Sequence, residues 1–137
     1  MSHERSEKEV ALLIEDFLGK LALALSKREK GEYSVEEMEK RMKGVVSILG
    51  ALSQRWSLGI IFLLYMRSLN FNELRDLLPG ISSRTLTDKL RMLERSGILT
   101  RNVMSSAPVR VRYSLSTRGR EIALSCLPLL YQLQKPE

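Results

Sequence analysis

The sequence predicts a mainly helical fold with one small β-hairpin. Long stretches carry apolar residues at steps of three and four, which is the spacing of one helical face. One stretch after Gly97 changes to the alternation of a β-strand. Serine, glycine and proline stand where these patterns begin and end. Hydrophobic residues make up 44% of the 137 residues, which is enough to form a core.

Residues 1–45 are predicted to form two amphipathic helices. The first covers residues 6–29 and ends before Gly31. Ser34 begins the second, with Glu37 completing a capping box. The inner face of the second helix is predicted to contain Met38, Met42, Val45, Val46 and Leu49. We interpret residues 1–45 as an extension for dimerisation or docking; the alternative is that they cover the core of their own chain.

Residues 46–137 are predicted to form a second domain around a buried helix. After a break at residues 53–56, residues 56–66 are nearly all apolar, which indicates a helix buried on most sides, with Trp56 as a core anchor. Asn70 and Glu73 form a second capping box at the start of a short helix that Pro79-Gly80 ends. The apolar face of that helix is predicted to contain Phe71, Leu74, Leu77 and Leu78.

The next predicted helix covers about residues 82–96. Serines can cap its first N–H groups, and Gly97 tolerates the left-handed conformation that ends it. Leu86, Leu90 and Leu93 share one face. The opposite face carries short polar groups and guanidiniums, which are the side chains that contact bases and phosphates. Two short helices joined by a tight turn containing glycine form a helix-turn-helix.

A β-hairpin is predicted at residues 98–115, with a turn around Pro108. In its second strand Val109, Val111, Tyr113 and Leu115 alternate with Arg110, Arg112 and Ser114. This pattern predicts one buried face and one basic face. A hairpin directly after such a helix completes a winged helix-turn-helix, with a solvated hairpin face as the alternative for the two arginines.

A last helix follows Ser116, and Pro128 is expected to kink it. Its apolar side is predicted to contain Ile122, Ala123, Cys126, Leu127, Leu130 and Tyr131. We interpret Cys126 as a small core or interface residue. Together with the N-terminal helices, this helix is expected to serve dimerisation.

The net charge of +6 is unevenly distributed. Residues 1–45 hold nine Lys/Arg and ten Asp/Glu, whereas residues 46–137 hold thirteen Lys/Arg and six Asp/Glu. A basic domain favours a polyanionic partner. The chain has one cysteine and one histidine, His3, so we expect no metal site, no cofactor and no catalytic pair, and hence no enzyme. It contains no long apolar run and no signal-peptide pattern, so we expect a cytoplasmic protein with no membrane partner.

The order of these parts resembles the HxlR-type winged helix-turn-helix family, which is related to the MarR regulators. The resemblance rests on matching residues spread over a little more than half of the chain: Arg55-Trp56, residues 70–74, 80–87, Leu90, Leu93-Glu94, residues 96–99, Arg101, residues 108–111, residues 113–116 and Gly119. It implies a homodimeric, sequence-specific transcription regulator. Residues 43–45 lack the cysteine of many redox-sensing members, and residues 1–33 are longer than the usual N-terminal segment.

Double-stranded DNA is therefore the expected partner, with the helix at 82–96 in the major groove and the wing at 98–115 on the backbone or minor groove. The candidates for reading base edges are Arg84, Thr87, Asp88 and Arg91. The candidates for phosphate contacts are Ser82, Ser83, Thr85, Lys89, Arg95, Arg110 and Arg112. The alternative is a protein-interaction module whose basic face binds an acidic protein. A small-molecule effector is left open, because no residue pattern identifies one.

Overall fold

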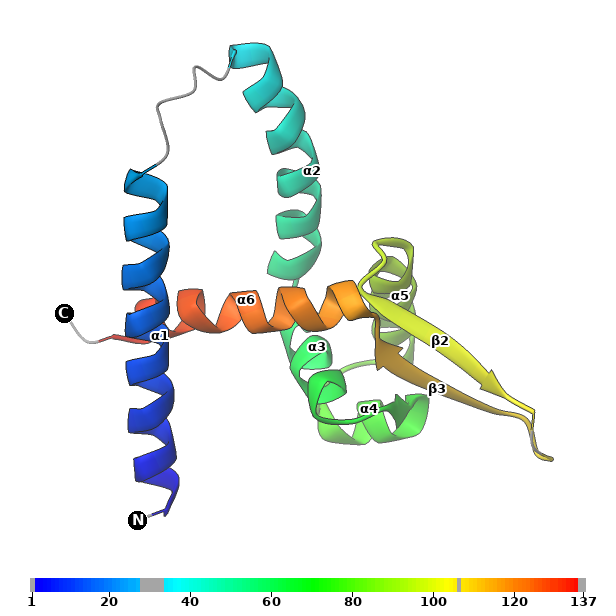
Figure 1. Cartoon of the computed structure of the whole chain (residues 1–137). Helices are drawn as coiled ribbons and strands as arrows, with labels where there is room; N and C mark the ends of the chain where they lie inside the picture. Colours follow the sequence, from blue (N-terminus) through cyan, green and yellow to red (C-terminus); the bar gives the residue numbers. More distant parts are fainter. Residues whose placement is uncertain (1, 28–33, 106, 136–137) are drawn as a thin grey trace. The chain divides into compact units, whose positions relative to one another are not determined.

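The computed structural model describes residues 2–27, 34–105 and 107–135, and these residues form helices and one small sheet (Figure 1). The elements in chain order are α1 (Ser2–Ser26), α2 (Val35–Ser53), α3 (Ser57–Met66), β1 (Leu69–Asn70), α4 (Phe71–Leu77), α5 (Ser83–Arg95), β2 (Leu99–Met104), β3 (Arg110–Leu115) and α6 (Thr117–Gln134). The predicted fold class is confirmed: α4, the turn, α5 and the β2–β3 hairpin follow one another as in a winged helix-turn-helix.

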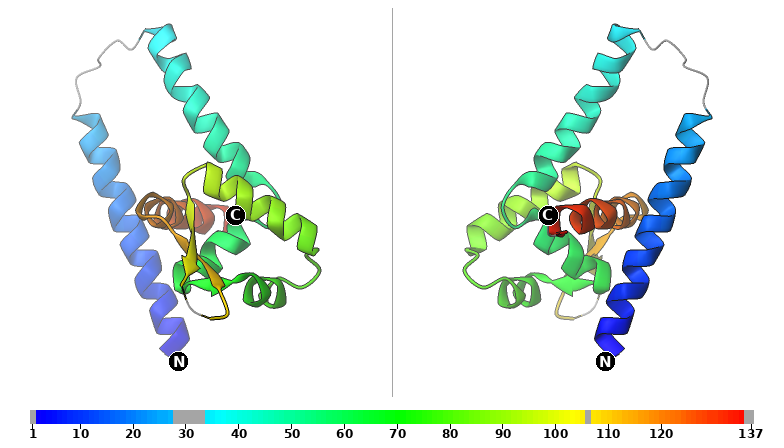
Figure 2. Two further views of the ribbon diagram at one scale, coloured as in Figure 1. Left: turned by 90° about the vertical axis from the view of Figure 1, so that its right-hand side faces the viewer. Right: turned by 90° about the vertical axis from the view of Figure 1, so that its left-hand side faces the viewer.

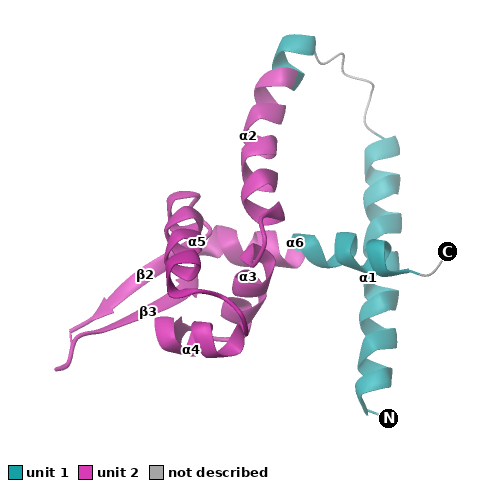
Figure 3. Cartoon of the chain, turned by 180° about the vertical axis from the view of Figure 1, so that it is seen from behind, with its two compact units in different colours: residues 1–38, 125–137 teal, residues 39–124 magenta. Residues whose placement is uncertain are grey.

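The chain divides into two compact units (Figure 3). One contains residues 1–38 and 125–137, and the other contains residues 39–124. The second unit holds the helix-turn-helix and the sheet. The first of these units combines the two ends of the chain. The predicted domain boundary at residue 45, which separates a dimerisation or docking extension from the winged domain, stays a prediction.

The core of the second unit is built largely from residues that the apolar patterns predicted. The almost completely buried side chains come from α3, β1, α4, α5 and the residues around the start of β2: Ile60, Ile61, Leu64, Leu69, Leu74, Leu86, Leu90, Leu93, Ile98 and Leu99. Helix α3 supplies three of them, which confirms it as the central buried helix. Trp56 itself is only half-buried and lies just before α3, with the Arg55 guanidinium 4.9 Å from the centre of its ring.

The sheet has three antiparallel strands in the order β1-β3-β2. Leu99 pairs with Leu115 at one end of the hairpin, and Met104 pairs with Arg110 near its tip. The two-residue strand β1 pairs with β3 through Leu69 and Tyr113. The sequence did not predict β1, because two residues are too few to show a strand period.

Several predicted helix boundaries are confirmed by side-chain caps and by glycine conformations. Ser34 and Glu37 form the first capping box, and Asn70 and Glu73 form the second with both hydrogen bonds at 2.8 Å. Gly97 has φ +73°, as predicted for the residue that follows α5. Gly80 has φ +91° in the turn between α4 and α5, a conformation that favours glycine.

Several details of the sequence prediction are wrong. Leu77 and Val109 were expected to be buried, but they are 44% and 69% exposed. Val109 precedes β3 near the hairpin tip, which extends beyond the helices, so no apolar layer covers it (Figure 1). Leu127 is also exposed. Helix α1 begins at Ser2 rather than residue 6, and an ion pair between Lys8 and Glu4 supports its first turns.

The predicted end of the first helix at residue 29 and the break at Gly31 lie outside the described residues. Helix α6, in which a kink was predicted at Pro128, continues as a helix through that residue to Gln134.

No single described helix is long and apolar enough to cross a membrane. Among the described residues, only α2 and α3 taken together have the necessary length and composition, and this pair is bent by 84°.

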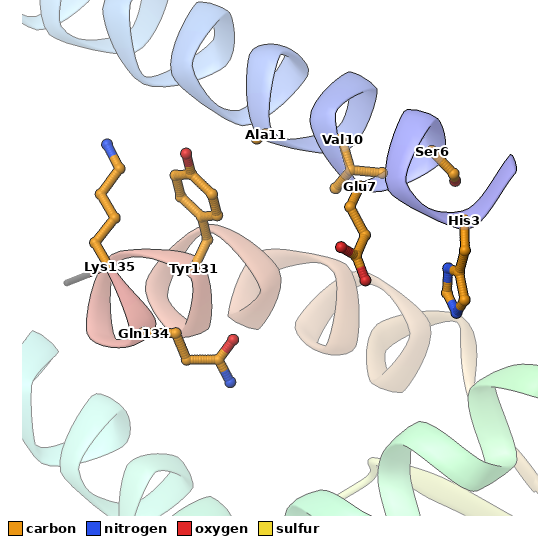
Figure 4. A pocket seen from close by; sticks show the side chains of 8 residues that line it. All are labelled: His3, Ser6, Glu7, Val10, Ala11, Tyr131, Gln134 and Lys135. Atoms are coloured by element: carbon orange, nitrogen blue, oxygen red, sulfur yellow. The ribbon is translucent and has the colours of Figure 1, made fainter. Parts of the chain in front are cut away.

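The first unit pairs α1 with the C-terminal end of α6. Lys135 Nζ and Tyr131 Oη both lie 3.2 Å from Glu15 Oε1. The hydrogen bond and charge of Lys135, with the hydrogen bond of Tyr131, lower the pKa of Glu15. Beside these contacts is a pocket of about 580 Å³ (Figure 4), lined by His3, Ser6, Glu7, Val10, Ala11, Tyr131, Gln134 and Lys135.

Helices α1 and α2, called the helical arms below, carry many large apolar side chains that are exposed. No described residue of α1 is buried. The exposed apolar residues of α1 are Val10, Leu12, Leu13, Phe17, Leu21, Leu23 and Leu25. Those of α2 are Val35, Met38, Met42, Val45, Val46 and Leu49. The predicted inner face of α2 is therefore exposed. Both interpretations of residues 1–45, as an extension for dimerisation or docking and as a cover for the core, stay predictions.

Candidate nucleic-acid interface

Helix α5 is held to the core by one face, and its other face is open to solvent. Leu86, Leu90 and Leu93 are at most 2% exposed. The side chains of Arg84, Asp88 and Arg91 are exposed on the remaining surface. None of these three forms a hydrogen bond or ion pair with a described residue. Their polar groups are therefore available to a partner along the length of the helix.

The N-terminus of α5 is fixed by its own serines and threonines. Ser82 Oγ accepts a hydrogen bond from Thr85 N at 3.0 Å and donates one to Thr85 Oγ1 at 2.8 Å. Arg75 Nη1 of α4 donates to Ser83 Oγ at 3.4 Å. Thr87 Oγ1 donates to the Ser83 carbonyl oxygen at 2.8 Å, so its hydroxyl proton is already used. Arg75 thus places an additional positive charge beside the start of α5, which the sequence analysis did not identify.

Lys89 lies to one side of this face, and Arg95 continues it one turn beyond Arg91 at the C-terminal end of α5. Lys89 Nζ donates to Gln54 Oε1 in the break between α2 and α3. Arg95 is exposed in the last turn of α5, where a cation complements the helix dipole. Both positions are compatible with contacts at the margin of an interface, and neither lies among the base-reading candidates.

The two arginines of β3 have different surroundings. Arg112 Nη2 donates to the Ser68 carbonyl oxygen at 3.0 Å and lies 3.8 Å from Glu73 Oε2. Arg110 is exposed and makes no hydrogen bond or ion pair with a described residue. The sequence predicted two equivalent basic side chains, but Glu73, also a member of the α4 capping box, partly neutralises Arg112.

We expect Arg112→Ala to destabilise the protein by about 1 kcal/mol, because the Ser68 carbonyl loses a charged donor and an ion pair that is more than one-third exposed adds little. The measurement is chemical denaturation of the purified protein. Arg110→Ala is the matched control on the same strand and should leave the unfolding midpoint unchanged. Equal midpoints for the two variants would contradict a structural role for Arg112.

The two strands of the hairpin also bring Arg101 of β2 and Tyr113 of β3 next to α5. They line a cleft with Thr87, Leu90, Arg91 and Glu94. Tyr113 was predicted as a buried residue, but it is only half-buried. Arg101 was not among the predicted site residues, although its alternation with Leu99 would have placed it on the inner face of the strand.

Within the described ranges, no group of three or more His, Cys, Asp or Glu side chains has the arrangement of a metal site. The surface at α5 and the hairpin instead combines guanidiniums, a threonine and serines. Figure 2 shows α5 and the β2–β3 hairpin from two sides. Arginine pairs with phosphate oxygens or with the edge of guanine, and a threonine methyl contacts thymine. Such a surface is chemically suited to duplex DNA.

Comparisons with known proteins agree with this geometry. Residues 51–135 match the model of a family described as HxlR-like helix-turn-helix. The HTH-type transcriptional regulator YvaP of Bacillus subtilis is 37% identical over 99 residues, which cover 72% of this chain and 85% of YvaP.

Two solved structures are also similar. Diamide-treated YodB from B. subtilis has a TM-score of 0.56 and 32% identity, covering 64% of this chain and 84% of YodB. The oxidised form of the redox regulator HypR has a TM-score of 0.60 and 30% identity, covering 68% of this chain and 97% of HypR. Helix α1 lies outside the region that the family model matches.

Proposed function

Since the chain belongs to the HxlR-like helix-turn-helix family of transcription regulators, we propose that it binds specific sequences of duplex DNA as a homodimer. The observation that carries the proposal is the outer face of α5, where Arg84, Asp88 and Arg91 are exposed without a described partner. In this proposal α5 enters the major groove and the β2–β3 hairpin lies on the adjacent backbone or minor groove.

DNA recognition in this proposal has three parts: electrostatic attraction of the duplex, phosphate contacts that position α5 on it, and contacts of side chains with base edges. Unpaired arginines on α5 and the hairpin attract the duplex and release counterions. The capped N-terminus of α5 presents backbone N–H groups, and with Ser83 and Arg75 it can bind a phosphate and set the register. Arg84, Thr87 and Asp88 then face the base edges, where each good bidentate contact contributes roughly 1–3 kcal/mol of discrimination.

The homodimer is supported by the helical arms. Both α1 and α2 expose rows of large apolar side chains that the single chain leaves uncovered. Exposed apolar patches of this extent usually mark an interface. A two-fold dimer would present two copies of α5 about 34 Å apart, which is one turn of DNA, on a pseudo-palindromic site.

Thiol sensing is not part of the proposal. Cys126 is the only cysteine, and burial raises its pKa. A thiol with a raised pKa stays protonated near neutral pH and is a weak nucleophile. The proposal places the protein in the cytoplasm, together with the DNA that it regulates.

The experiment is a titration of the full-length protein against a mixed-sequence duplex over a range of salt concentrations, with sedimentation to determine the oligomeric state. We expect a dimer whose binding weakens linearly with the logarithm of salt concentration. Binding to an acidic protein but not to duplex DNA at moderate salt would instead favour the protein-interaction module. A monomer in sedimentation would contradict the assembly part of the proposal.

A further inference from the structure

A cleft of about 290 Å³ opens between α5 and the β2–β3 hairpin. Leu90 is buried at this cleft, whereas Arg91, Glu94 and Arg101 are exposed around it. Thr87 and Tyr113 are half-buried in its walls. All of the lining residues belong to the unit of residues 39–124, so the cleft lies within one compact body.

The sheet register explains why Arg101 faces α5. Arg101 is paired with Tyr113 across the hairpin, two residues along from the pair of Leu99 and Leu115. Residues two apart in a strand share a face, and Leu99 and Leu115 are both buried. Arg112 pairs with Asn102 on the opposite face. On the inner face of the hairpin, the buried pair of Leu99 and Leu115 is therefore followed by the Arg101 guanidinium and the Tyr113 phenol.

The charges in the cleft are not balanced. Arg91 and Arg101 form no hydrogen bond or ion pair with a described residue, and Glu94 lies beyond ion-pair distance of both. Two guanidiniums and one carboxylate leave an excess of positive charge in a small space. Two like charges repel at short range, and an anion between them removes the repulsion.

The position of the cleft along α5 suggests which part of DNA it meets. A recognition helix contacts base edges mainly with its N-terminal residues. Arg91 follows the first residue of α5, Ser83, by eight positions, which is roughly 12 Å at 1.5 Å per residue. A cleft about 12 Å from the start of α5, between the helix and the wing, is therefore expected to face the sugar-phosphate backbone of the DNA rather than its base edges.

We propose that this cleft binds a backbone phosphate of the DNA duplex. Arg101 donates to the phosphate oxygens, the Tyr113 hydroxyl supplies a second donor, and Arg91 approaches from α5. The planar guanidinium matches two phosphate oxygens at once. This inference rests on the proposed function, and it assigns Arg91 to the backbone although the sequence placed it among the base-reading candidates.

The experiment compares wild type, Arg101→Ala and Arg118→Ala in binding two duplexes of different base sequence at several salt concentrations. Arg118 is the matched control, since it is exposed in the same unit and lines none of this cleft. One phosphate contact contributes a salt slope of about 0.9, so Arg101→Ala should bind about fivefold more weakly near 0.15 M salt, with a slope shallower by about 0.9. Arg118→Ala should match wild type.

A second variant makes the cleft more positive, whereas Arg101→Ala makes it less positive. Glu94→Gln removes the one carboxylate among the lining residues and should tighten binding several-fold for every duplex sequence. Thermal melting establishes that each variant is folded before its binding is compared.

The outcomes separate this inference from the proposed function. If wild type binds no duplex, the proposed function fails and the cleft proposal fails with it. If wild type binds and Arg101→Ala matches it in affinity and salt slope, only the cleft proposal is overturned. A loss confined to one base sequence would also overturn it, because a phosphate contact acts equally on all sequences.

Discussion

Replacing Gly119 by alanine is expected to destabilise the protein by about 3 kcal/mol or more, the upper part of the range for overpacked sites. A Cβ atom at this position would lie 1.9 Å from the carbonyl oxygen of Ile98 and 2.9 Å from its carbonyl carbon. That contact is with backbone, so no flexible side chain can move aside. The first turn of α6 or the start of β2 must shift instead.

The junction at Ile98 cannot shift without further losses. The Ile98 carbonyl oxygen accepts hydrogen bonds from Ser116 N and Ser116 Oγ, both at 3.0 Å. Ser116 Oγ also accepts from Gly119 N at 2.9 Å, which caps α6. Movement of the helix would strain this network at the junction that joins the hairpin to α6.

Thermal melting measures the effect, and Gly44→Ala is the control. Gly44 lies within α2, and a Cβ there would have no neighbour within 4 Å from outside its own helical turns. Alanine at this position should therefore raise stability by roughly 0.5–1 kcal/mol through helix propensity. The two substitutions should therefore change the melting temperature in opposite directions. A Gly119→Ala protein that melts with wild type would show that α6 does not approach Ile98 this closely.

Replacing Arg84 by alanine is expected to weaken binding to the preferred DNA sequence by about 5- to 150-fold, which corresponds to roughly 1–3 kcal/mol for one bidentate base contact. Arg84 is the second residue of α5, and its side chain is exposed without a described partner. The core face of the helix is untouched, so the melting temperature should stay the same. Competition binding of specific and mixed-sequence duplexes measures the change.

Arg84→Lys separates base reading from charge at this position. Lysine keeps the positive charge but lacks the planar fork that binds two acceptors at once. Base reading by Arg84 predicts that Arg84→Lys also loses much of the preference for the specific duplex. Full specificity in the lysine variant would assign Arg84 to a phosphate.

The sequence predicted the second unit well because its helices begin and end at residues with strong local preferences. Asn70 and Glu73 cap α4 through hydrogen bonds within four residues, and Ser82 caps α5 in the same way. Gly97 adopts a positive φ that few other residues tolerate. Such local interactions can be read from short stretches of sequence.

The long-range contacts could not be predicted in this way. The strand β1 exists because Leu69 and Asn70 reach β3 more than 40 residues later. Arg112 is held by Ser68 and Glu73, which precede it by 44 and 39 residues. Arg101 enters the candidate site only through the packing of the hairpin against α5, so its spacing from Arg91 carries no signal.

Sequence-specific recognition by α5 is tested by selecting bound duplexes from a random pool with the full-length protein. We expect a pseudo-palindromic motif with two half-sites whose centres are about 34 Å, one helical turn, apart. We also expect Arg84→Ala to select the same motif with the preference at one base pair of each half-site lost. Recovery of no common motif from duplexes that the wild type binds tightly would contradict sequence-specific recognition by α5.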